Sequence, residues 1–298
     1  MKLVEVPNHE FMESPSSWLT RIAFRQVVSP RELARYLDVK IRVDCEMTLA
    51  RSSFEELATK ITMTAGSFKM VDSVMGRLRK IDPNGERYLL RHRSVAYHRF
   101  CAACLATDKT KYFRLEWRFK CWRWCPIHSC MLWERCPHCG KVVTLPGDMY
   151  SAGPDGLGIA TLDRCLHCAE LLTTGWQAFV DSLADNVTTP WEQVLIKNGR
   201  SALAALASGR LCIQGEQKTY SFTQLKKIER LGYLPHVNFR LTHDELIRRQ
   251  DGESHVHTVN DGPRASESAH SDFHQPAMRE ISFDAPLESD VHASLFGP

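Results

Sequence analysis

The sequence predicts a mainly α-helical protein: an N-terminal, helix-turn-helix-like helical domain, two sequential structural zinc fingers, further helices and a disordered acidic tail. Three features predict this order. Apolar residues recur at helical spacing between residues 14 and 80, four cysteine or histidine pairs follow between 101 and 168, and the chain becomes polar and acidic after 250. We therefore divide the chain into an N-terminal helical domain (1–86), a tandem zinc-finger module (87–174), a C-terminal helical segment (175–250) and a tail (251–298).

Two short helices are predicted first, joined by one or two residues. The first has Ser16 or Ser17 as its N-cap. The second begins at "SPRE", residues 29–32, a capping box with Pro30 at the first helical position. One face of each helix is marked at helical spacing, by Trp18, Leu19, Ile22, Ala23 and Gln26 in the first and by Leu33, Tyr36 and Leu37 in the second.

Two further helices are predicted before the cysteines. "SFEE" at 53–56 begins the third, and "DPNGE" at 82–86 is a turn that ends the fourth. Their apolar stripes are Phe54, Leu57, Ala58 and Ile61, and Phe68, Val71, Val74, Met75 and Leu78. The gap between the second and third helices is too long for an ordinary helix-turn-helix. A helical domain that does not place a helix in a DNA groove therefore remains the alternative.

The eleven cysteines are interpreted as metal ligands and not as disulfides. The first twenty residues lack the apolar core of a signal peptide, and no apolar run approaches the about 18 residues that span a bilayer. We therefore expect a cytoplasmic protein with no membrane partner. The reducing cytoplasm disfavours disulfides.

Four ligand pairs each have two residues between their members, a spacing that lets one tight turn direct both side chains at one ion. Taken in sequence order they give two sets of four. We predict that two structural Zn²⁺ ions are bound, one by Cys101, Cys104, Cys125 and His128, and one by Cys136, Cys139, Cys165 and Cys168. Because protein fills all four positions in each set, neither ion has an open position for substrate.

The pairing of the ligand pairs has an alternative. In the cross-brace of a RING domain the first pair would join the third and the second would join the fourth. The seven residues from Ser129 to Arg135 are too many for that arrangement and favour sequential fingers. Cys121 and Cys130 are out of register with the pairs and are expected to be buried or free thiols, although Cys130 can compete with His128 as a ligand.

Charge is distributed unevenly along the chain. Residues 1–140 contain 24 Lys or Arg and 15 Asp or Glu, whereas residues 251–298 contain 2 and 9. A basic front suggests an anionic partner such as nucleic acid. The candidate contacts are Arg91, Arg93, Arg114, Arg118 and Arg123. In the alternative interpretation, the aromatic rings interleaved with these arginines pack a small core and the arginines cover its outside.

Four segments together resemble the TniQ/TnsD family of transposon target-selection proteins. They are "ESPSSWLTRIA" (13–23), "RFCAACLATD…YFRLEWR" (99–118), "CPIH" (125–128) and "CPHCG" (136–140). The resemblance covers about residues 5–170. The sequence departs from the family in "CAAC", where a proline would be commoner, and in its extra Cys121 and Cys130.

The resemblance implies a non-catalytic accessory protein that links a target-recognising element to an AAA+ ATPase regulator of the transposase. Some family members read target DNA, and others dock on an RNA-guided CRISPR effector complex, often as a homodimer, so these are the implied partners. The alternatives are a zinc-finger DNA-binding transcription regulator and a RING-like ubiquitin ligase. No catalytic or cofactor-binding constellation stands out, so we expect no enzyme activity.

Overall fold

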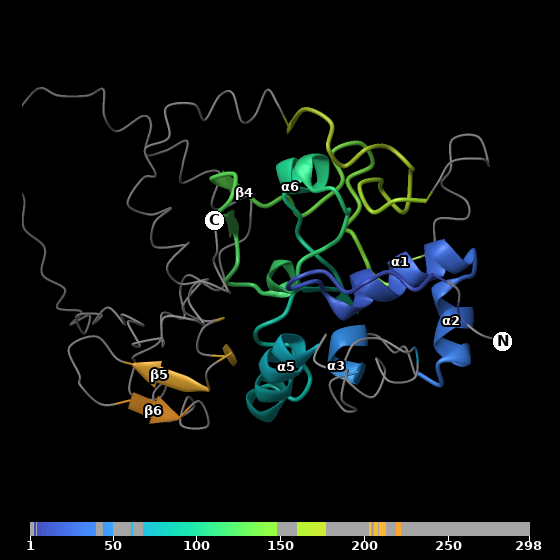
Figure 1. The fold of residues 1–298 in the computed structure, drawn as a ribbon. Helices are drawn as coiled ribbons and strands as arrows, with labels where there is room; N and C mark the ends of the chain where they lie inside the picture. Colours follow the sequence, from blue (N-terminus) through green and yellow to red (C-terminus); the bar gives the residue numbers. More distant parts are fainter. Residues whose placement is uncertain are drawn as a thin grey trace, which may run out of the picture.

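The computed structural model describes residues 3, 5–39, 44–49, 61, 68–147, 160–176, 203, 206–207, 209–212 and 219–221. In Figure 1, helix α1 (Pro15–Gln26) crosses the middle of this part of the chain. Helices α3 (Cys45–Leu49) and α5 (Lys69–Ile81) lie on one side of α1, and the cysteine-bearing loops lie on the other. The N-terminal helices and the cysteine-bearing loops share one buried core, in which residues before and after 86 pack together.

Helices α1 and α2 (Pro30–Tyr36) begin at serine caps followed by proline, as their sequences suggest. The cap of α1 is Ser14, however, and not Ser16 or Ser17. Its side chain accepts from the Ser17 N–H at 3.2 Å. The capping box of α2 is confirmed, because Ser29 and Glu32 bond to each other's backbone N–H. Three residues connect the two helices.

Helix α5 presents its predicted apolar stripe to the core, and the turn at residues 82–86 ends it, with Gly85 at φ +71°. Helix α3 lies in the stretch that the sequence left as a connection. It packs between α1 and α5. The helix predicted to begin at "SFEE" lies outside the described residues, so the helix-turn-helix-like arrangement stays a prediction.

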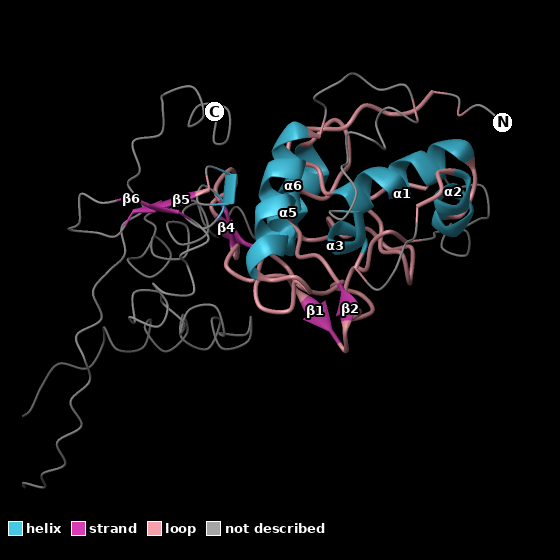
Figure 2. Cartoon of the chain, turned by 90° about the horizontal axis from the view of Figure 1, so that it is seen from below, coloured by secondary structure: helices cyan, strands magenta, loops and turns pink. Residues whose placement is uncertain are grey.

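The cysteine-bearing part is mostly loop, which corrects the mainly α expectation for the described residues. Its regular elements are short: β1 (Arg91–His92) with β2 (Val95–Ala96), α6 (Ala102–Thr107), the 3₁₀ turn η1 (Leu115–Arg118), and β3 (Trp124–Cys125) with β4 (Cys130–Met131). Figure 2 shows the β1–β2 hairpin projecting from this body. Ligand turns that converge on one metal ion can hold a chain in a fixed conformation, so such a chain does not need long helices or strands.

The C-terminal segment was expected to be helical, but its described part includes an antiparallel pair, β5 (Arg210–Cys212) and β6 (Thr219–Ser221). The remaining helices predicted for 175–250 and the whole acidic tail lie outside the described residues. The predicted domain boundaries therefore stay predictions. Among the described residues, no helix has the length and apolar character that crossing a bilayer requires.

Arg118 is fully buried and joins the N-terminal helices to the cysteine-bearing part. Its guanidinium donates to Asp44 Oδ2 at 2.7 Å and lies 3.5 Å from Glu46 Oε2, both on or beside α3. It also donates to the carbonyls of Leu90 and Tyr97, at 3.0 and 2.7 Å. A buried cation is tolerated only when its donors are taken up in this way.

The serines of "ESPSSW" complete the same buried network. Ser16 bonds to Glu46, and Ser14 Oγ lies 3.1 Å from His98 Nε2. Ser17 Oγ accepts from the Phe113 N–H at 2.9 Å and donates to Glu13 at 2.9 Å. Burial and the nearby Arg118 lower the pKa of His98 well below its usual value, so the imidazole is neutral. The motif therefore docks α1 onto the "YFRLEWR" segment.

The aromatic residues of that segment pack inward, as the alternative interpretation of the basic stretch proposed. Phe113 stands edge-on to Trp117, Phe100 and His98, with ring centroids 5.6 to 6.2 Å apart. Phe113, Trp117 and Phe119 are all buried. These rings are core residues and are not available for stacking on bases.

Replacing Asp44 tests the buried network. Asp44→Ala leaves the buried guanidinium of Arg118 without its closest carboxylate and should lower the free energy of unfolding by about 3–5 kcal/mol. The matched control is Glu86→Ala. Glu86 is 70 % exposed and lies 3.9 Å from Arg91, so its loss should cost at most about 1 kcal/mol. Chemical denaturation measures both, and equal effects would contradict a central role for Arg118.

Candidate metal centre

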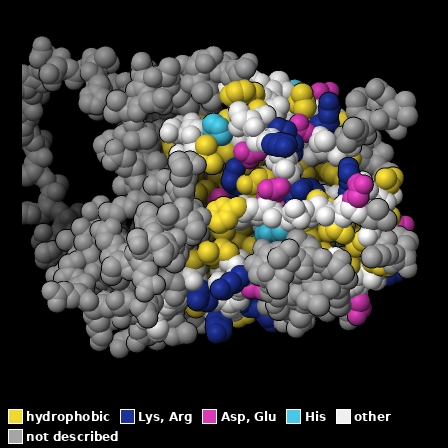
Figure 3. All heavy atoms as spheres, viewed as in Figure 1, with side chains coloured by type: hydrophobic (Ala, Val, Ile, Leu, Met, Phe, Trp, Pro, Cys, Tyr) yellow, Lys and Arg dark blue, Asp and Glu magenta, His cyan; other side chains and the backbone are white. Residues whose placement is uncertain are grey.

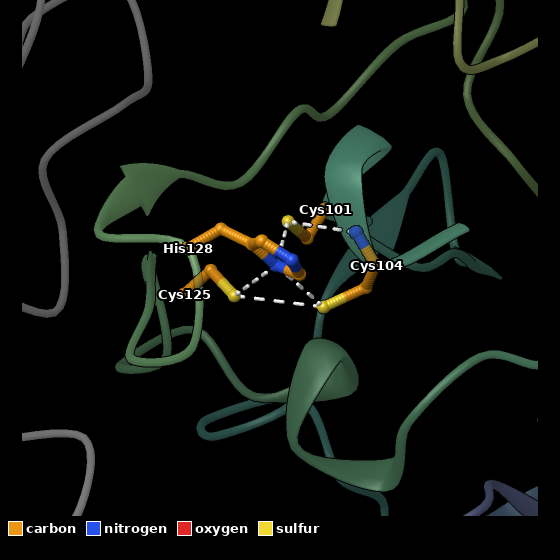
Figure 4. Close-up of side chains that lie close together, drawn as sticks. All are labelled: Cys101, Cys104, Cys125 and His128. Carbon is orange, nitrogen blue, oxygen red and sulfur yellow. Dashed lines mark hydrogen bonds between the residues drawn. The ribbon is translucent and has the colours of Figure 1, made fainter. Parts of the chain in front are cut away.

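The first group of predicted ligands lies where α6 meets the β3–β4 hairpin. Cys101 is the N-cap of α6, and its Sγ accepts from the Cys104 N–H at 3.4 Å. Cys125 ends β3, and His128 lies in the turn that follows. In Figure 4 the four side chains point toward one centre from these two elements. Their ligand atoms all lie within 4.8 Å of one another, so the group can hold one metal ion.

The distances within this group match the edges of a zinc tetrahedron. With Zn–S of about 2.3 Å and Zn–N of about 2.0–2.1 Å, tetrahedral S···S and S···N edges are about 3.8 and 3.6 Å. The Cys104 and Cys125 sulfurs are 3.6 Å apart. His128 Nδ1 lies 3.6, 3.3 and 3.7 Å from the sulfurs of Cys101, Cys104 and Cys125. The imidazole therefore presents Nδ1 as its ligand atom.

Among the three cysteines of this group, Cys125 is the one that loses its proton most readily. Hydrogen bonds from the thiols of Cys101 and Cys104 lower the pKa of Cys125 well below its ordinary value. A thiolate is the form of cysteine that binds metal. The three cysteines are buried, whereas His128 is half-buried near the surface, with Nε2 3.4 Å from Thr107 Oγ1.

The second group is built from two turns of the same shape. In "CPHCG" and "CLHCA" the sulfur of the first cysteine accepts, at 3.4 Å, from the N–H of the residue two positions on. Gly140 and Ala169 follow the second cysteine at φ +68° and +63°. Across the turns Cys136 lies 3.7 Å from Cys168, and Cys139 lies 3.6 Å from Cys165. These distances again match tetrahedral edges.

Two arginines that sequence reasoning missed support these turns. Arg135 donates to the Gly140 carbonyl at 3.1 Å, and Arg164 donates to the Ala169 carbonyl at 3.0 Å. Each arginine also begins an antiparallel bridge to the residue seven positions on, Val142 or Leu171. The signal was present in the sequence as a repeat, "RCPHCG" and "RCLHCA", which extends the cysteine spacing by one residue on each side.

The grouping of the ligands is sequential. The first pair joins the second and the third joins the fourth, in contrast to the alternating pairing of a RING cross-brace. Cys121 and Cys45 are buried and belong to neither group. Cys130 is buried beside the first group, with its sulfur 3.6 Å from that of Cys101. Within the described residues, both groups have four protein donors, the composition of a structural site and not of an open catalytic one.

Two of the five candidate nucleic-acid contacts are internal. Arg118 carries the buried network described above. Arg123 is also buried, and its Nε donates to the Lys120 carbonyl at 3.3 Å. Burial, with Arg99 close by, lowers the pKa of Arg123 to about 10. Neither side chain lies where it can meet a phosphate.

The other three candidates differ in exposure. Arg114 bonds to Asp108 at 2.8 Å and lies over the Tyr112 ring, 5.0 Å from its centroid. Arg91 is partly buried and bonds to Asp44 at 3.3 Å and to a backbone carbonyl. Arg93 is exposed at the tip of the β1–β2 hairpin, at φ +48° in a two-residue turn with Ser94 at +67°. Arg93 is the candidate that the fold presents to solvent.

The fold and sites define a class of protein: a helical N-terminal part fused through a buried polar network to a loop-rich part with two closed Cys/His groups. Residues 7–132 match the model of the TniQ family. This confirms the resemblance to the TniQ family over the matched range, which contains three of the four segments quoted above. The matched range includes the first group of four and ends before the second. No curated protein matches the chain.

The TniQ match supports an association of this chain with transposition as an accessory protein. The matched residues coincide with the buried body described above. They include the docking serines of α1, the carboxylates of α3 and Arg118. The segments "ESPSSW" and "YFRLEWR" therefore contain residues that hold the domain together.

The two equivalent turns of the second group permit a paired test. Gly140→Ala places a side chain at φ +68°, with no atom within 4 Å of the added Cβ, and should cost about 1 kcal/mol from backbone strain alone. Ala169→Gly removes the same strain at φ +63° and should be neutral or stabilising by about 0.5 kcal/mol. Unfolding free energies measure both. Destabilisation by both changes would contradict the equivalence of the turns.

Proposed function

We propose that the protein is a non-catalytic target-selection factor of transposition. It links target DNA, or an RNA-guided DNA-binding complex, to the AAA+ ATPase that regulates the transposase. The single observation that carries this proposal is the TniQ match over residues 7–132. The buried ion pairs of Arg118 with Asp44 and Glu46 join distant segments of the domain, as a scaffold role requires.

We further propose that each Cys/His group binds one structural Zn²⁺. Support comes from the S···S and S···N distances of 3.3 to 3.7 Å, which suit tetrahedral coordination. Metal-linked folding free energy of about 10–16 kcal/mol per structural zinc would order loops that contain few regular elements. Zinc in this role fixes the surface that partners meet and takes no part in a reaction.

The proposed nucleic-acid surface is the tip of the β1–β2 hairpin, with α5 beside it. Arg91 at the base of the hairpin bonds to the Asn84 carbonyl, in the turn that ends α5. Lys and Arg side chains gather over α5 in Figure 3, and its last turn carries Arg79 and Lys80. Exposed cations on one side of a domain are suited to phosphate contact.

A DNA-binding transcription regulator remains the second candidate function. The observation that favours it is the three-residue connection between α1 and α2, a length typical of helix-turn-helix motifs. In that case the exposed Arg31 of α2 would carry DNA contacts in place of Arg93.

Replacing Arg93 separates these candidates. Arg93→Gln should weaken binding of the full chain to duplex DNA and reduce the slope of log K against log salt by about one unit, with unchanged unfolding. Arg31→Gln is the matched surface change and should leave DNA binding as it is. Loss on Arg31→Gln but not on Arg93→Gln would instead favour the transcription regulator. Fluorescence anisotropy at several salt concentrations measures both.

The partner is tested by a pull-down with an AAA+ ATPase regulator of transposition. The full chain should retain the ATPase, and more of it when target DNA is present. A variant with one ligand removed from each group, Cys104→Ser with Cys165→Ser, should retain none. Cys121→Ser, which changes a buried thiol outside both groups, should behave as the wild type. No retention by the wild type, with or without DNA, would contradict the adaptor role.

A further inference from the structure

A fifth donor, Cys130, lies beside the four that form the first metal group. Cys130 begins β4 directly opposite Cys125 on β3, and its side chain is buried. Its Sγ lies 3.6 Å from Cys101 Sγ, close to the about 3.8 Å edge of a zinc–sulfur tetrahedron. Cys130 does not belong to the set whose ligand atoms all lie within 4.8 Å of one another. The Cys130 sulfur is therefore close enough to Cys101 to share a metal ion with it, but His128 occupies the fourth coordination position.

His128 is the ligand whose place is easiest to exchange. It lies in the turn between β3 and β4, whereas the three cysteines are anchored in α6 and in β3. Its ring is half-buried, and its second nitrogen meets Thr107 at the surface. The neighbouring Ile127 is 61 % exposed, so the turn is held by few apolar contacts. The β3–β4 pairing, in contrast, keeps Cys130 at the site.

We propose that Cys130 is an alternative fourth ligand of the first site and replaces His128 when the hairpin turn moves away. The inference rests on the zinc content proposed above. In the exchange the bond from zinc to His128 Nδ1 breaks, a bond from zinc to Cys130 Sγ forms, and the thiol proton passes to the released imidazole. The ligand set gains one negative charge and the imidazole gains one positive charge, so the total charge is conserved.

The exchange gives the domain a metal centre that survives a movement of its surface turn. Residues 126–129 can leave the metal, for example on meeting a partner, while four sulfurs keep the ion and the core in place. Cys121 cannot serve in this way. It is buried in the same part of the chain, outside the metal group, and burial raises its thiol pKa to about 12. Cys121 is therefore the matched control.

The experiment compares His128→Ala, Cys130→Ala, His128→Ala/Cys130→Ala and His128→Ala/Cys121→Ala in the full chain. Zinc is counted by elemental analysis, and ligand type is read from the optical spectrum of the cobalt(II)-substituted protein. The wild type and Cys130→Ala should hold two equivalents, with one S₃N and one S₄ site. His128→Ala and His128→Ala/Cys121→Ala should hold two equivalents with S₄ spectra only. His128→Ala/Cys130→Ala should hold one, retained by the second group, and far-UV circular dichroism reports whether this variant is folded.

Two results would overturn the proposal. One is loss of an equivalent from His128→Ala alone. The other is the same metal content and spectrum in His128→Ala and His128→Ala/Cys130→Ala, which would mean that water fills the fourth position. Fewer than two equivalents in the folded wild type would instead overturn the proposed zinc content itself, so the two failures are distinguishable.

Discussion

The buried guanidinium of Arg118 is the constraint on which the described body depends. It takes two carboxylates from the α3 region and two carbonyls from the segments that flank the β1–β2 hairpin. One of those carboxylates, Glu46, in turn bonds to Ser16 at the start of α1. A charge this deep is costly to desolvate and is stable only with every partner in place. The network therefore fixes the relative position of elements that are short and individually weak.

The two Cys/His groups relate differently to that body. The first lies between α6 and the β3–β4 hairpin, and all three of its cysteines belong to the same hydrophobic core as the helices, whereas two of the four cysteines of the second group, Cys136 and Cys165, belong to it. The second is a pair of matching turns with partly exposed second cysteines, each supported by an arginine from its own sequence. Loss of order at the first would reach the core directly. The second is a local unit whose geometry repeats because its sequence repeats.

Most of the arginines in the basic segment are structural. Arg99 supports the loop before β3 by donating to three backbone carbonyls and to Glu134. Arg114 and Arg123 are likewise bonded within the fold. The count of Lys and Arg in the front half is therefore larger than the number of cations that a nucleic acid could contact. Several of the guanidinium groups are used instead to bond carbonyls within the loops. Arg93 at the hairpin tip and Lys80 at the end of α5 are among the cations that stay exposed in the described part of the chain.

The sequence by itself determined the local units: helices α1 and α5, the capping box of α2, the turn after α5, and the consecutive grouping of eight candidate ligands. These depend on interactions within a few residues, or on ligand pairs whose spacing favours the consecutive arrangement. Only the tertiary structure decided that Arg118 and Arg123 face inward, that Ser14 and not Ser16 caps α1, and that Cys130 lies beside the first group. The environments of Arg118 and Cys130 depend on partners far away along the chain, Asp44 and Cys101 respectively, and spacing carries no information about them.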